Sequence, residues 1–464
     1  MRQPALRSPR RLSAVVSMCA LLALTARAQL RSLVPITSAG YDHRDALLSP
    51  DGNFVAFRGP SMLGVVAYGG GSEVPVVQAN LNIGSVLWSP DSLGLYYLSG
   101  TDLRYVPRGG GNSRSVAVLP ESGISLWDIK ADGTELFGTW LYVRNNGSQV
   151  IRETHIFAIA ADGSSAPRTV VTSLVTLDGV RLSPDGMRMV YREYDPTPFA
   201  PRDYMVANID GSSPVSLTGG LGLNINAGLP AWRPDGAGIV YERIDRSLSR
   251  PVVEQLLLGN TTPIRMSLPE PARNLSVSRD GAWVVYEGLF ASTNWSPFVM
   301  PIDGGGHIAL DPSRPLQFAG TPQLGGPAGD RVVISGTLAT ASSAQVYKVE
   351  LARELRVAPR AVTGGMVRFD LPVTAAELGV IFMAAALGPS FPIPGLGGAF
   401  QLDAATAVVV VSGTSSAQGT VGVDVQVPNV GALRLAPLAL QGVRLLTLSP
   451  AAGDFTRPVR LPVF

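Results

Sequence analysis

Four carboxylates in the middle of the chain are spaced as two pairs. Glu193 and Asp195 form the first pair, and Glu242 and Asp245 form the second about 50 residues later. Two acids held about 5 to 10 Å apart can share the acid and base roles of glycoside cleavage. If the fold brings these pairs together, the sequence predicts a carboxylate-based hydrolase or lyase that acts on a polysaccharide or peptide.

The same two stretches also carry arginine and tyrosine. Mixed charge beside aromatic side chains is typical of a recognition surface, and it is equally typical of a solvated loop with local ion pairs. The candidate binding residues are Glu193, Tyr194, Asp195, Arg202, Asp203, Tyr204, Glu242, Arg243, Asp245 and Arg246.

Other kinds of catalytic site find little support in the sequence. No Gly-x-Ser-x-Gly nucleophile elbow occurs, so a propeller-linked serine peptidase is not expected. The three histidines, His43, His155 and His307, are far apart, whereas a histidine metal site needs two or three converging ligands. We therefore expect no metal, no cofactor and, on balance, no catalysis.

The first 28 residues resemble a secretory signal peptide. Arginines precede an apolar stretch from about Ala14 to Ala26, and Ala26-Arg27-Ala28 fits a small-residue cleavage site. The apolar stretch is shorter than the roughly 20 residues of a transmembrane helix. We expect cleavage after Ala28, a periplasmic or secreted protein, and no transmembrane segment afterwards.

Charge and cysteine content narrow the possible partners. Without the five arginines of residues 1–28, 32 basic residues stand against 35 acidic ones, which does not favour nucleic acid. The only cysteine, Cys19, lies in the signal segment, so disulfides and thiolate sites are excluded from the mature chain.

One short turn signature recurs seven times along the chain. Its clearest copies are Ser49-Pro50-Asp51-Gly52, Ser89-Pro90-Asp91, Ser183-Pro184-Asp185-Gly186 and Arg233-Pro234-Asp235-Gly236. The steps between its aspartates are 40, 41, 53, 50, 45 and 50 residues. This period, with several short apolar runs in each unit, predicts an all-β, seven-bladed β-propeller.

The fourth repeat shows the plan of one blade. Short strands are expected at 180–182, 188–191, 204–207 and 215–218, separated by turns rich in Pro, Asp and Gly. Proline presets φ in such a turn, and aspartate hydrogen-bonds its own backbone. The repeated aspartates are therefore expected to be turn residues and not catalytic ones.

The repeat resembles that of the TolB-type, WD-repeat-like propeller family. The resemblance consists of the Ser-Pro-Asp-Gly turn, the aromatic residue after it and a later Asp-Gly hairpin, over about residues 38 to 363. The aromatic positions are Phe57, Tyr97, Tyr191, Tyr241 and Tyr286. TolB has an α/β domain ahead of its propeller, whereas here the blades follow the signal segment directly.

By analogy with WD-repeat blades, binding loops are expected at the second-to-third and fourth-to-first strand connections. The spacing from the turn aspartate to the next hairpin is 18 residues in repeats one and two and 23 to 30 in repeats three, four and six. One side of this rim is therefore predicted to be built up. Blade three adds Arg144, Arg152 and His155, and blade six adds Glu287 and Trp295.

A ring of blades must also be closed. Either Leu33–Thr37 or Ala361–Thr363 can supply the last strand of the seventh blade, whose third strand is expected at 345–349. Both choices give seven blades and remove the open sheet edges that promote aggregation.

The repeat stops near residue 364, which divides a propeller at 29–363 from a domain at 364–464. Short apolar or alternating runs, such as Val408–Val411 and Val421–Val425, predict a small β-sandwich-like domain. Residues 428–433 and 440–443 resemble a C-terminal module of exported planctomycete proteins, for which a structural or attachment role is expected.

Two functions follow. The first is an exported, non-enzymatic and monomeric propeller that binds an envelope or secreted protein or polymer through one rim. The alternative is the carboxylate hydrolase or lyase, which requires that the acids point toward one another and are not held by arginines.

Overall fold

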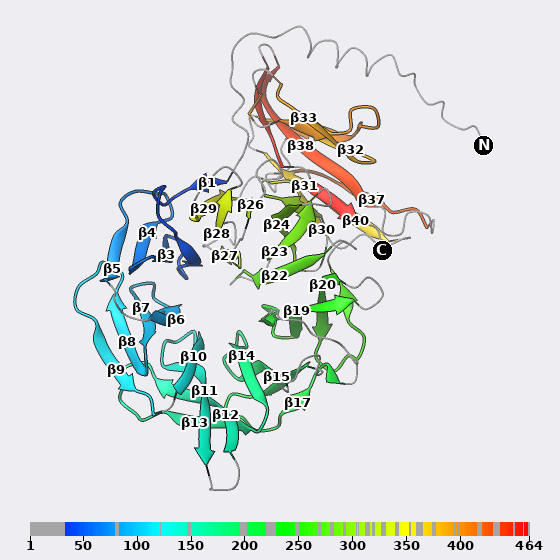
Figure 1. Ribbon diagram of the computed structural model, residues 1–464. Coiled ribbons are helices and arrows are strands. Elements are labelled where there is room, and N and C mark those ends of the chain that lie inside the picture. Colours follow the sequence, from blue (N-terminus) through cyan, green and yellow to red (C-terminus); the bar gives the residue numbers. More distant parts are fainter. Residues whose placement is uncertain are drawn as a thin grey trace. The chain divides into compact units, whose positions relative to one another are not determined.

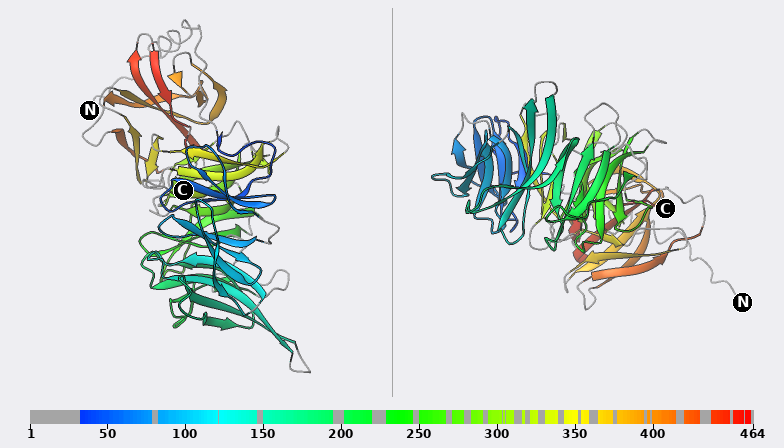
Figure 2. Two further views of the ribbon diagram at one scale, coloured as in Figure 1. Left: turned by 90° about the vertical axis from the view of Figure 1, so that its left-hand side faces the viewer. Right: turned by 90° about the horizontal axis from the view of Figure 1, so that it is seen from below.

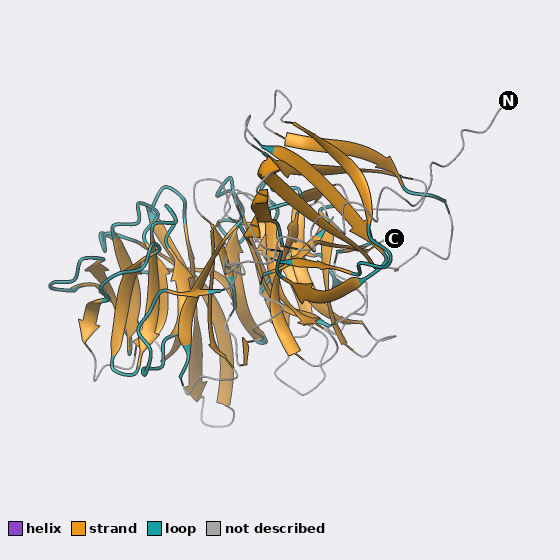
Figure 3. Cartoon of the chain, turned by 90° about the horizontal axis from the view of Figure 1, so that it is seen from above, coloured by secondary structure: helices purple, strands orange, loops and turns teal. Residues whose placement is uncertain are grey.

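The computed structural model describes strands and connecting loops, and no α-helix, in the part of the chain that it covers (Figure 3). That part is residues 33–462 without the stretches 79–82, 121, 146–149, 195–201, 220–228, 246–249, 267–270, 279–282, 291–293, 303, 305, 311–315, 318–320, 326–330, 339–342, 352–353, 359–364, 374–376, 394–395, 398, 415–419, 430–436, 449–450 and 458.

The chain divides into two compact units. One consists of Ser32–Gly305 and Ala309–Ala352, and the other contains Arg353–Phe464 together with Gly306–Ile308. The sequence placed the boundary after residue 363. In the structure, the strand at residues 356–358 already belongs to the C-terminal unit.

The first unit is a seven-bladed propeller of antiparallel sheets (Figure 1). Blades one to three are β2 (Arg44–Leu48), β3 (Phe54–Gly59), β4 (Met62–Ala67) and β5 (Val74–Gln78); β6 (Ile83–Trp88), β7 (Gly94–Ser99), β8 (Asp102–Pro107) and β9 (Arg114–Val118); and β10 (Ser122–Ile129), β11 (Glu135–Asn145), β12 (Val150–Ala160) and β13 (Arg168–Ser173).

Blades four to seven follow the same order. They are β14 (Thr176–Leu182), β15 (Arg188–Tyr194), β16 (Arg202–Asn208) and β17 (Val215–Ser216); β18 (Ala231–Trp232), β19 (Gly238–Asp245), β20 (Arg250–Leu257) and β21 (Ile264–Arg265); β22 (Ala272–Val277), β23 (Trp283–Phe290) and β24 (Asn294–Pro301); and β26 (Leu316–Gln317), β27 (Gln323–Gly325), β28 (Arg331–Leu338), β29 (Gln345–Glu350) and β1 (Val34–Pro35).

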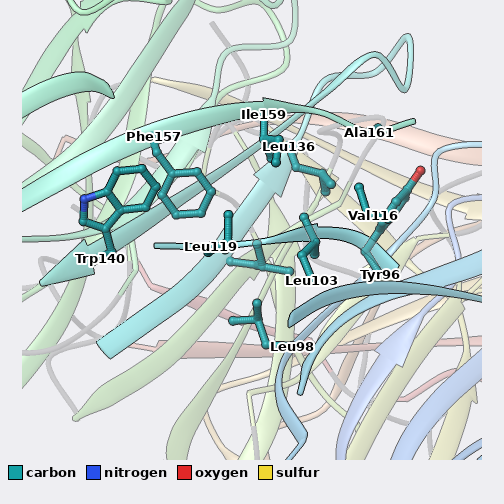
Figure 4. Packing of buried hydrophobic residues seen from close by; sticks show 11 residues of the cluster. Tyr96, Leu98, Leu103, Val116, Leu119, Leu136, Trp140, Phe157, Ile159 and Ala161 are labelled. Carbon is teal, nitrogen blue, oxygen red and sulfur yellow. The ribbon is translucent and has the colours of Figure 1, made fainter. Parts of the chain in front are cut away.

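The first strand of each blade lies nearest the axis, as β6, β10, β14 and β22 show in Figure 1. Apolar side chains of neighbouring sheets then pack face to face. Between blades two and three, for example, Leu98 and Leu103 pack with Leu136 and Phe157 (Figure 4). Similar clusters join blades one and two, three and four, four and five, five and six, and seven and one, so much of the propeller core lies in interfaces between sheets.

The five repeated aspartates that the structure describes are turn residues, as predicted, and each accepts a hydrogen bond from the backbone amide two residues later. The Ser183 hydroxyl donates to the Asp185 carboxylate at 2.5 Å, and the Met187 amide donates to it at 3.0 Å. These two hydrogen bonds lower the pKa of Asp185. Its charge stabilises a tight turn at the end of the first strand and is not available for catalysis.

The N-terminal strand closes the ring. Val34 and Pro35 of β1 pair with Lys348 and Tyr347 of β29, and the Ile36 amide donates to the Val346 carbonyl at 2.9 Å. The predicted third strand at 345–349 is thereby confirmed, as is the Leu33–Thr37 alternative for the closing strand. The competing segment Ala361–Thr363 lies outside the described residues.

The C-terminal unit is a small two-layered β-domain. One sheet contains β30 (Arg356–Ala358), β31 (Met366–Pro372) and β37 (Thr420–Gln426); the other contains β32 (Leu378–Ala384), β36 (Val408–Thr414), β38 (Pro437–Leu448), β39 (Ala451–Phe455), β40 (Val459–Pro462) and β34 (Leu396–Gly397), and β33 (Leu387–Phe391) pairs with β35 (Phe400–Leu402). His307 and Ile308 of β25 (His307–Ala309) pair with β40. The predicted β-sandwich-like architecture is confirmed.

Candidate functional site

The residue that follows the repeat aromatic has a constant place in the blades. Alternation along the second strand sends the aromatic ring, such as Tyr241, into an interface between sheets and turns the next side chain to the opposite face. That next residue is charged in four blades. We call these four the joint residues: Arg58, Arg192, Glu242 and Glu287.

The first strand of several blades carries a β-bulge opposite the joint residue. The register of the strand pair shifts after Arg44 in β2, after Asp178 in β14 and after Arg273 in β22. The next residue has a positive φ each time, 52° at Asp45, 64° for Gly179 and 54° at Asn274. Such a bulge exposes backbone groups that a regular ladder would pair. Two of the joint residues, Arg58 and Glu242, bind backbone groups of a bulged strand in the next blade.

Between blades one and two, an arginine binds these backbone groups. Arg58 donates to the Ile83 carbonyl at 2.9 Å and to the Gly84 carbonyl, both in β6 of the next blade. Its guanidinium also lies 3.3 Å from the carboxylate of Asp45. Arg58 therefore joins two blades by a charge-assisted contact.

In blade four the arginine binds an acid of its own sheet. Arg192 donates to both carboxylate oxygens of Asp178, at 2.6 and 2.8 Å, and the Tyr194 hydroxyl donates to Asp178 at 3.1 Å. Arg192 is buried, and this bidentate pairing compensates for its burial.

Between blades five and six, the joint residue is an acid. Glu242 is 5% exposed, and its Oε2 accepts a hydrogen bond from the Asn274 amide of β22 at 3.0 Å. Burial raises the pKa of Glu242 to about 7, against the smaller opposing effects of the Asn274 amide and of Arg273. This group therefore titrates near neutral pH.

A second buried acid, Glu287, binds the same bulge. Glu287 is 1% exposed, and its Oε2 accepts from the Asn274 side-chain amide at 2.9 Å and from Arg273 at 2.9 Å. Its Oε1 is buried without a hydrogen-bond partner among the described residues. Burial raises the pKa of Glu287 as well. Arg273, which binds Glu287, also stacks 3.9 Å above the centre of the Trp295 ring.

Glu242 and Glu287 are not placed to donate a proton to a substrate. A general acid must come within hydrogen-bond reach of the group that it protonates. Glu242 and Glu287 are both almost fully buried and bind backbone and side-chain groups of β22. The pair is a joint between blades whose charge depends on pH.

The predicted site residues of blade four divide into different roles. Asp203 accepts hydrogen bonds from the Thr218 amide and hydroxyl and so fixes the fourth strand. Tyr204 is fully buried against Tyr241 and cannot contact a ligand on a rim. Glu193 accepts from the Ser173 hydroxyl at 3.0 Å, and Tyr194 binds Asp178 as described above.

The predicted site residues of blade five are mostly held by ion pairs. Arg243 binds both carboxylate oxygens of Glu254, at 2.6 and 2.8 Å, and Asp245 binds Arg265. Of the four acids in the hydrolase hypothesis, Asp245 is thus paired with an arginine and Glu242 points to the adjacent blade. Asp195, Arg246 and the side chain of Arg202 lie outside the described residues.

The predicted asymmetry of the rim is present, but in blade three it takes another form. In blades one and two the second and third strands have six residues each and are joined by two residues. In blade three the corresponding strands, β11 and β12, each have 11 residues. The extra length is therefore a regularly paired two-stranded hairpin, which extends past its sheet in Figure 2.

Within the described residues, no three or more His, Cys, Asp and Glu side chains lie close enough together to hold a metal ion. His43 lies 3.3 Å from Glu73, and His155 lies 3.6 Å from Glu153 in another blade. No helix in the described part of the chain has the length and apolar character needed to span a membrane.

The sequence reasoning missed the partners of the joint residues. Asp178 and Asn274 belong to no motif, and their importance depends on the bulges and on strand register. A signal was present nonetheless. A charged residue directly follows the repeat aromatic in Phe57-Arg58, Tyr191-Arg192, Tyr241-Glu242 and Tyr286-Glu287.

Solved structures with the same fold are numerous. An oligogalacturonate lyase from Vibrio parahaemolyticus matches with a TM-score of 0.56 and 14% identity, over 70% of this chain and 98% of that one. An oligogalacturonate lyase in complex with manganese matches with a TM-score of 0.51 and 14% identity over the same shares. A puromycin-hydrolyzing peptidase from Mycobacterium tuberculosis matches with a TM-score of 0.50 and 17% identity, over 75% of this chain and 62% of that chain.

These likenesses establish a β-propeller fold and transfer no activity. A putative TolB from Agrobacterium tumefaciens is also similar, at 18% identity over 60% of this chain, but its TM-score of 0.41 leaves the fold assignment to the other structures. No protein-family model matches the chain, and no curated protein matches it either.

Proposed function

We propose that this chain is an exported, non-enzymatic propeller that binds an envelope or secreted protein or polymer on the rim formed by the second-to-third strand connections of blades three to six. The observation that carries the proposal is the uneven rim. Blades one and two end in two-residue connections, whereas the strands of blade three extend to 11 residues. Variable extensions on a rigid ring are where binding surfaces usually form.

The state of the buried acids also supports binding over catalysis. Asp245 is bound by Arg265, and Glu242 and Glu287 lie buried against β22. None of these acids is placed to meet a substrate. The proposal includes cleavage after Ala28 and a periplasmic or secreted location.

The test replaces the rim and keeps the ring. In one variant, residues 195–201 and 246–249 are each exchanged for the Gly-Thr connection of blade two. A control variant carries a matched change on the opposite face, with Gly109–Gly111 shortened by one residue. Wild type and control should capture the same envelope protein or sediment with the same purified envelope polymer, and the rim variant should not. Equal capture by all three proteins, and also by a variant whose blade-three residues 142–153 are exchanged in the same way, would refute the proposal.

A carboxylate enzyme is the second candidate. Two acids with raised pKa values next to one arginine are an arrangement found at active sites, and one similar structure is an oligogalacturonate lyase. Incubation with oligogalacturonate, followed through the ultraviolet absorbance of unsaturated products, tests this candidate. Turnover that disappears in Glu242→Gln would establish the enzyme, and we expect no turnover in either protein.

A further inference from the structure

The outer end of the blade-three hairpin extends beyond the neighbouring strands. We call this end the arm: Tyr142–Asn145 of β11 and Val150–Glu153 of β12, which pair with each other in register. The pairing of β10 with β11 ends at Leu141, and the pairing of β13 with β12 ends at Thr154. Within the described residues, neither outer edge of the arm has a partner strand.

Such an arm is an unusual structure to retain. A two-stranded ribbon alone is marginally stable in water, and unpaired strand edges readily pair with another chain. The same chain avoids both problems in blade two, where β7 and β8 end level with their sheet and are joined by Gly100-Thr101. The extension in blade three therefore calls for a function.

The two faces of the arm differ in chemistry. On one face Val143 lies opposite Arg152, and Asn145 lies opposite Val150. Val143 is 48% exposed and Val150 58% exposed. On the other face the single acid, Glu153, is already in contact with Arg144 at 3.7 Å and with His155 at 3.6 Å. The exposed apolar groups thus share a face with Arg152, which forms no ion pair with a described residue.

We propose that the arm is a strand-addition site, where the free edge of β12 pairs with an extended segment of a partner protein. Val150 and Arg152 are two residues apart and therefore face the same way. An added strand must place an apolar residue opposite Val150 and an acidic residue opposite Arg152, again two residues apart. This inference rests on the proposed rim-binding function and specifies a class of partner for it.

The test uses capped eight-residue peptides. One consists of two copies of Thr-Glu-Thr-Val, a second has Lys in place of Glu, and a third has Pro in place of the central Thr. Fluorescence anisotropy should show that the intact protein binds the Glu peptide about tenfold more tightly than the Lys peptide. The Pro peptide should bind weakly, because it lacks a backbone donor for the ladder.

Two protein variants separate strand addition from unspecific attraction. In the first, residues 142–153 are replaced by the Gly-Thr connection of blade two, which should abolish binding while circular dichroism and the melting temperature show an intact propeller. In the second, Arg152→Glu should reverse the preference in favour of the Lys peptide. Undiminished binding by the trimmed protein, or an unchanged preference in Arg152→Glu, would overturn the proposal.

Failure here is distinguishable from failure of the proposed function. If the trimmed protein still captures the envelope partner that the variant of blades four and five loses, the rim binds without the arm and only this inference is wrong. If no variant changes capture, the rim proposal itself is wrong.

Discussion

The joint between blades one and two and the joint between blades five and six use the same position with opposite charge. Arg58 donates to backbone carbonyls of the next blade, and Glu242 accepts from a backbone amide of the next blade. Both residues follow the repeat aromatic, and in both joints the partner strand is bulged. A repeat can therefore change the charge of a buried contact without changing its architecture, provided that the neighbouring bulge presents the matching backbone group.

The comparison also separates the two joints by burial. The Arg58 side chain is 34% exposed, so water can solvate part of its charge. Glu242 is 5% exposed and has a second buried acid nearby. The contribution of Arg58 to the free energy of unfolding should therefore be independent of pH near neutrality, whereas that of Glu242 should change with pH.

The largest effect is expected from giving the second joint the charge of the first. Glu242→Arg would place a buried cation against the Asn274 amide donor and close to Arg273 and Arg192, and the nearby acid Glu287 would offset only part of this repulsion. We expect a loss of about 4 kcal/mol in the free energy of unfolding, measured by urea denaturation at pH 7. The reverse exchange, Arg58→Glu, should lower the free energy of unfolding by a smaller amount, because that position is more exposed. Equal losses would show that burial does not distinguish the joints.

The second largest expected effect is a gain in stability when Glu242 is replaced by glutamine. The pKa of Glu242 is raised from 4.5 to about 7, so the folded protein holds this proton more tightly than the unfolded chain. The stabilising contribution is complete below pH 4.5 and is lost as the pH rises through about 7. Glu242→Gln, which mimics the protonated acid, should therefore be more stable than wild type by about 3 kcal/mol at pH 8 and nearly unchanged at pH 4.

Urea denaturation from pH 4 to 8 measures this difference. Asp185→Asn serves as the control, because the pKa of Asp185 is lowered by hydrogen bonds to its charged form and its loss should cost stability at neutral pH. A gain for Glu242→Gln that is the same at pH 4 and pH 8 would contradict the assignment of Glu242 as the titrating group.

Removing the arginine of the first joint should have a smaller effect. Arg58→Ala leaves the Ile83 and Gly84 carbonyls without this donor, and we expect a loss of about 2 kcal/mol in the free energy of unfolding. The loss should be constant between pH 5 and 8, since an arginine guanidinium and backbone carbonyls do not change charge in this range. A loss that varies across this range would remove the contrast between the two joints.

The smallest effect concerns the bulge itself. Asn274 has a φ of 54°, and the equivalent residue of blade four is Gly179 with a φ of 64°. Glycine adopts this conformation without strain, whereas alanine does not. Asn274→Ala should be about 1 kcal/mol less stable than Asn274→Gly by thermal denaturation, with Gly179→Ala as a second case. Equal stability of the two Asn274 variants would argue against a strained bulge.

Much of the fold follows from local sequence chemistry. The Ser-Pro-Asp-Gly turns predict the blades because serine, proline, aspartate and glycine each satisfy one requirement of a tight turn. The sequence predicts two alternatives for the closing strand, and the structure confirms the one that contains Val34 and Pro35. These features depend on residues close together in the chain or on an edge that must be covered.

The candidate site was harder to predict, for a physical reason. A β-bulge inserts one residue and reverses which side chains meet, so the contacts of Glu242 could not be derived from strand alternation alone. Tyr204 was expected at the start of the strand at 204–207 and Asp203 in the loop before it. The strand instead begins at Arg202, so Tyr204 is a core residue and Asp203 is a strand contact. In blade three the extra residues lengthened two strands, because Tyr142, Val143, Val150 and Ile151 favour extended backbone.

The pairing of β1 with β29 has a consequence for folding during synthesis. The ribosome makes the first partner of this seam near residue 34 and the second only at residues 345–350. Until then the nascent chain has unpaired strand edges, and the earlier blades can form only an open arc. A chaperone that covers these strand edges would protect the open arc until its two ends meet. Export of the chain in an unfolded state would have the same effect.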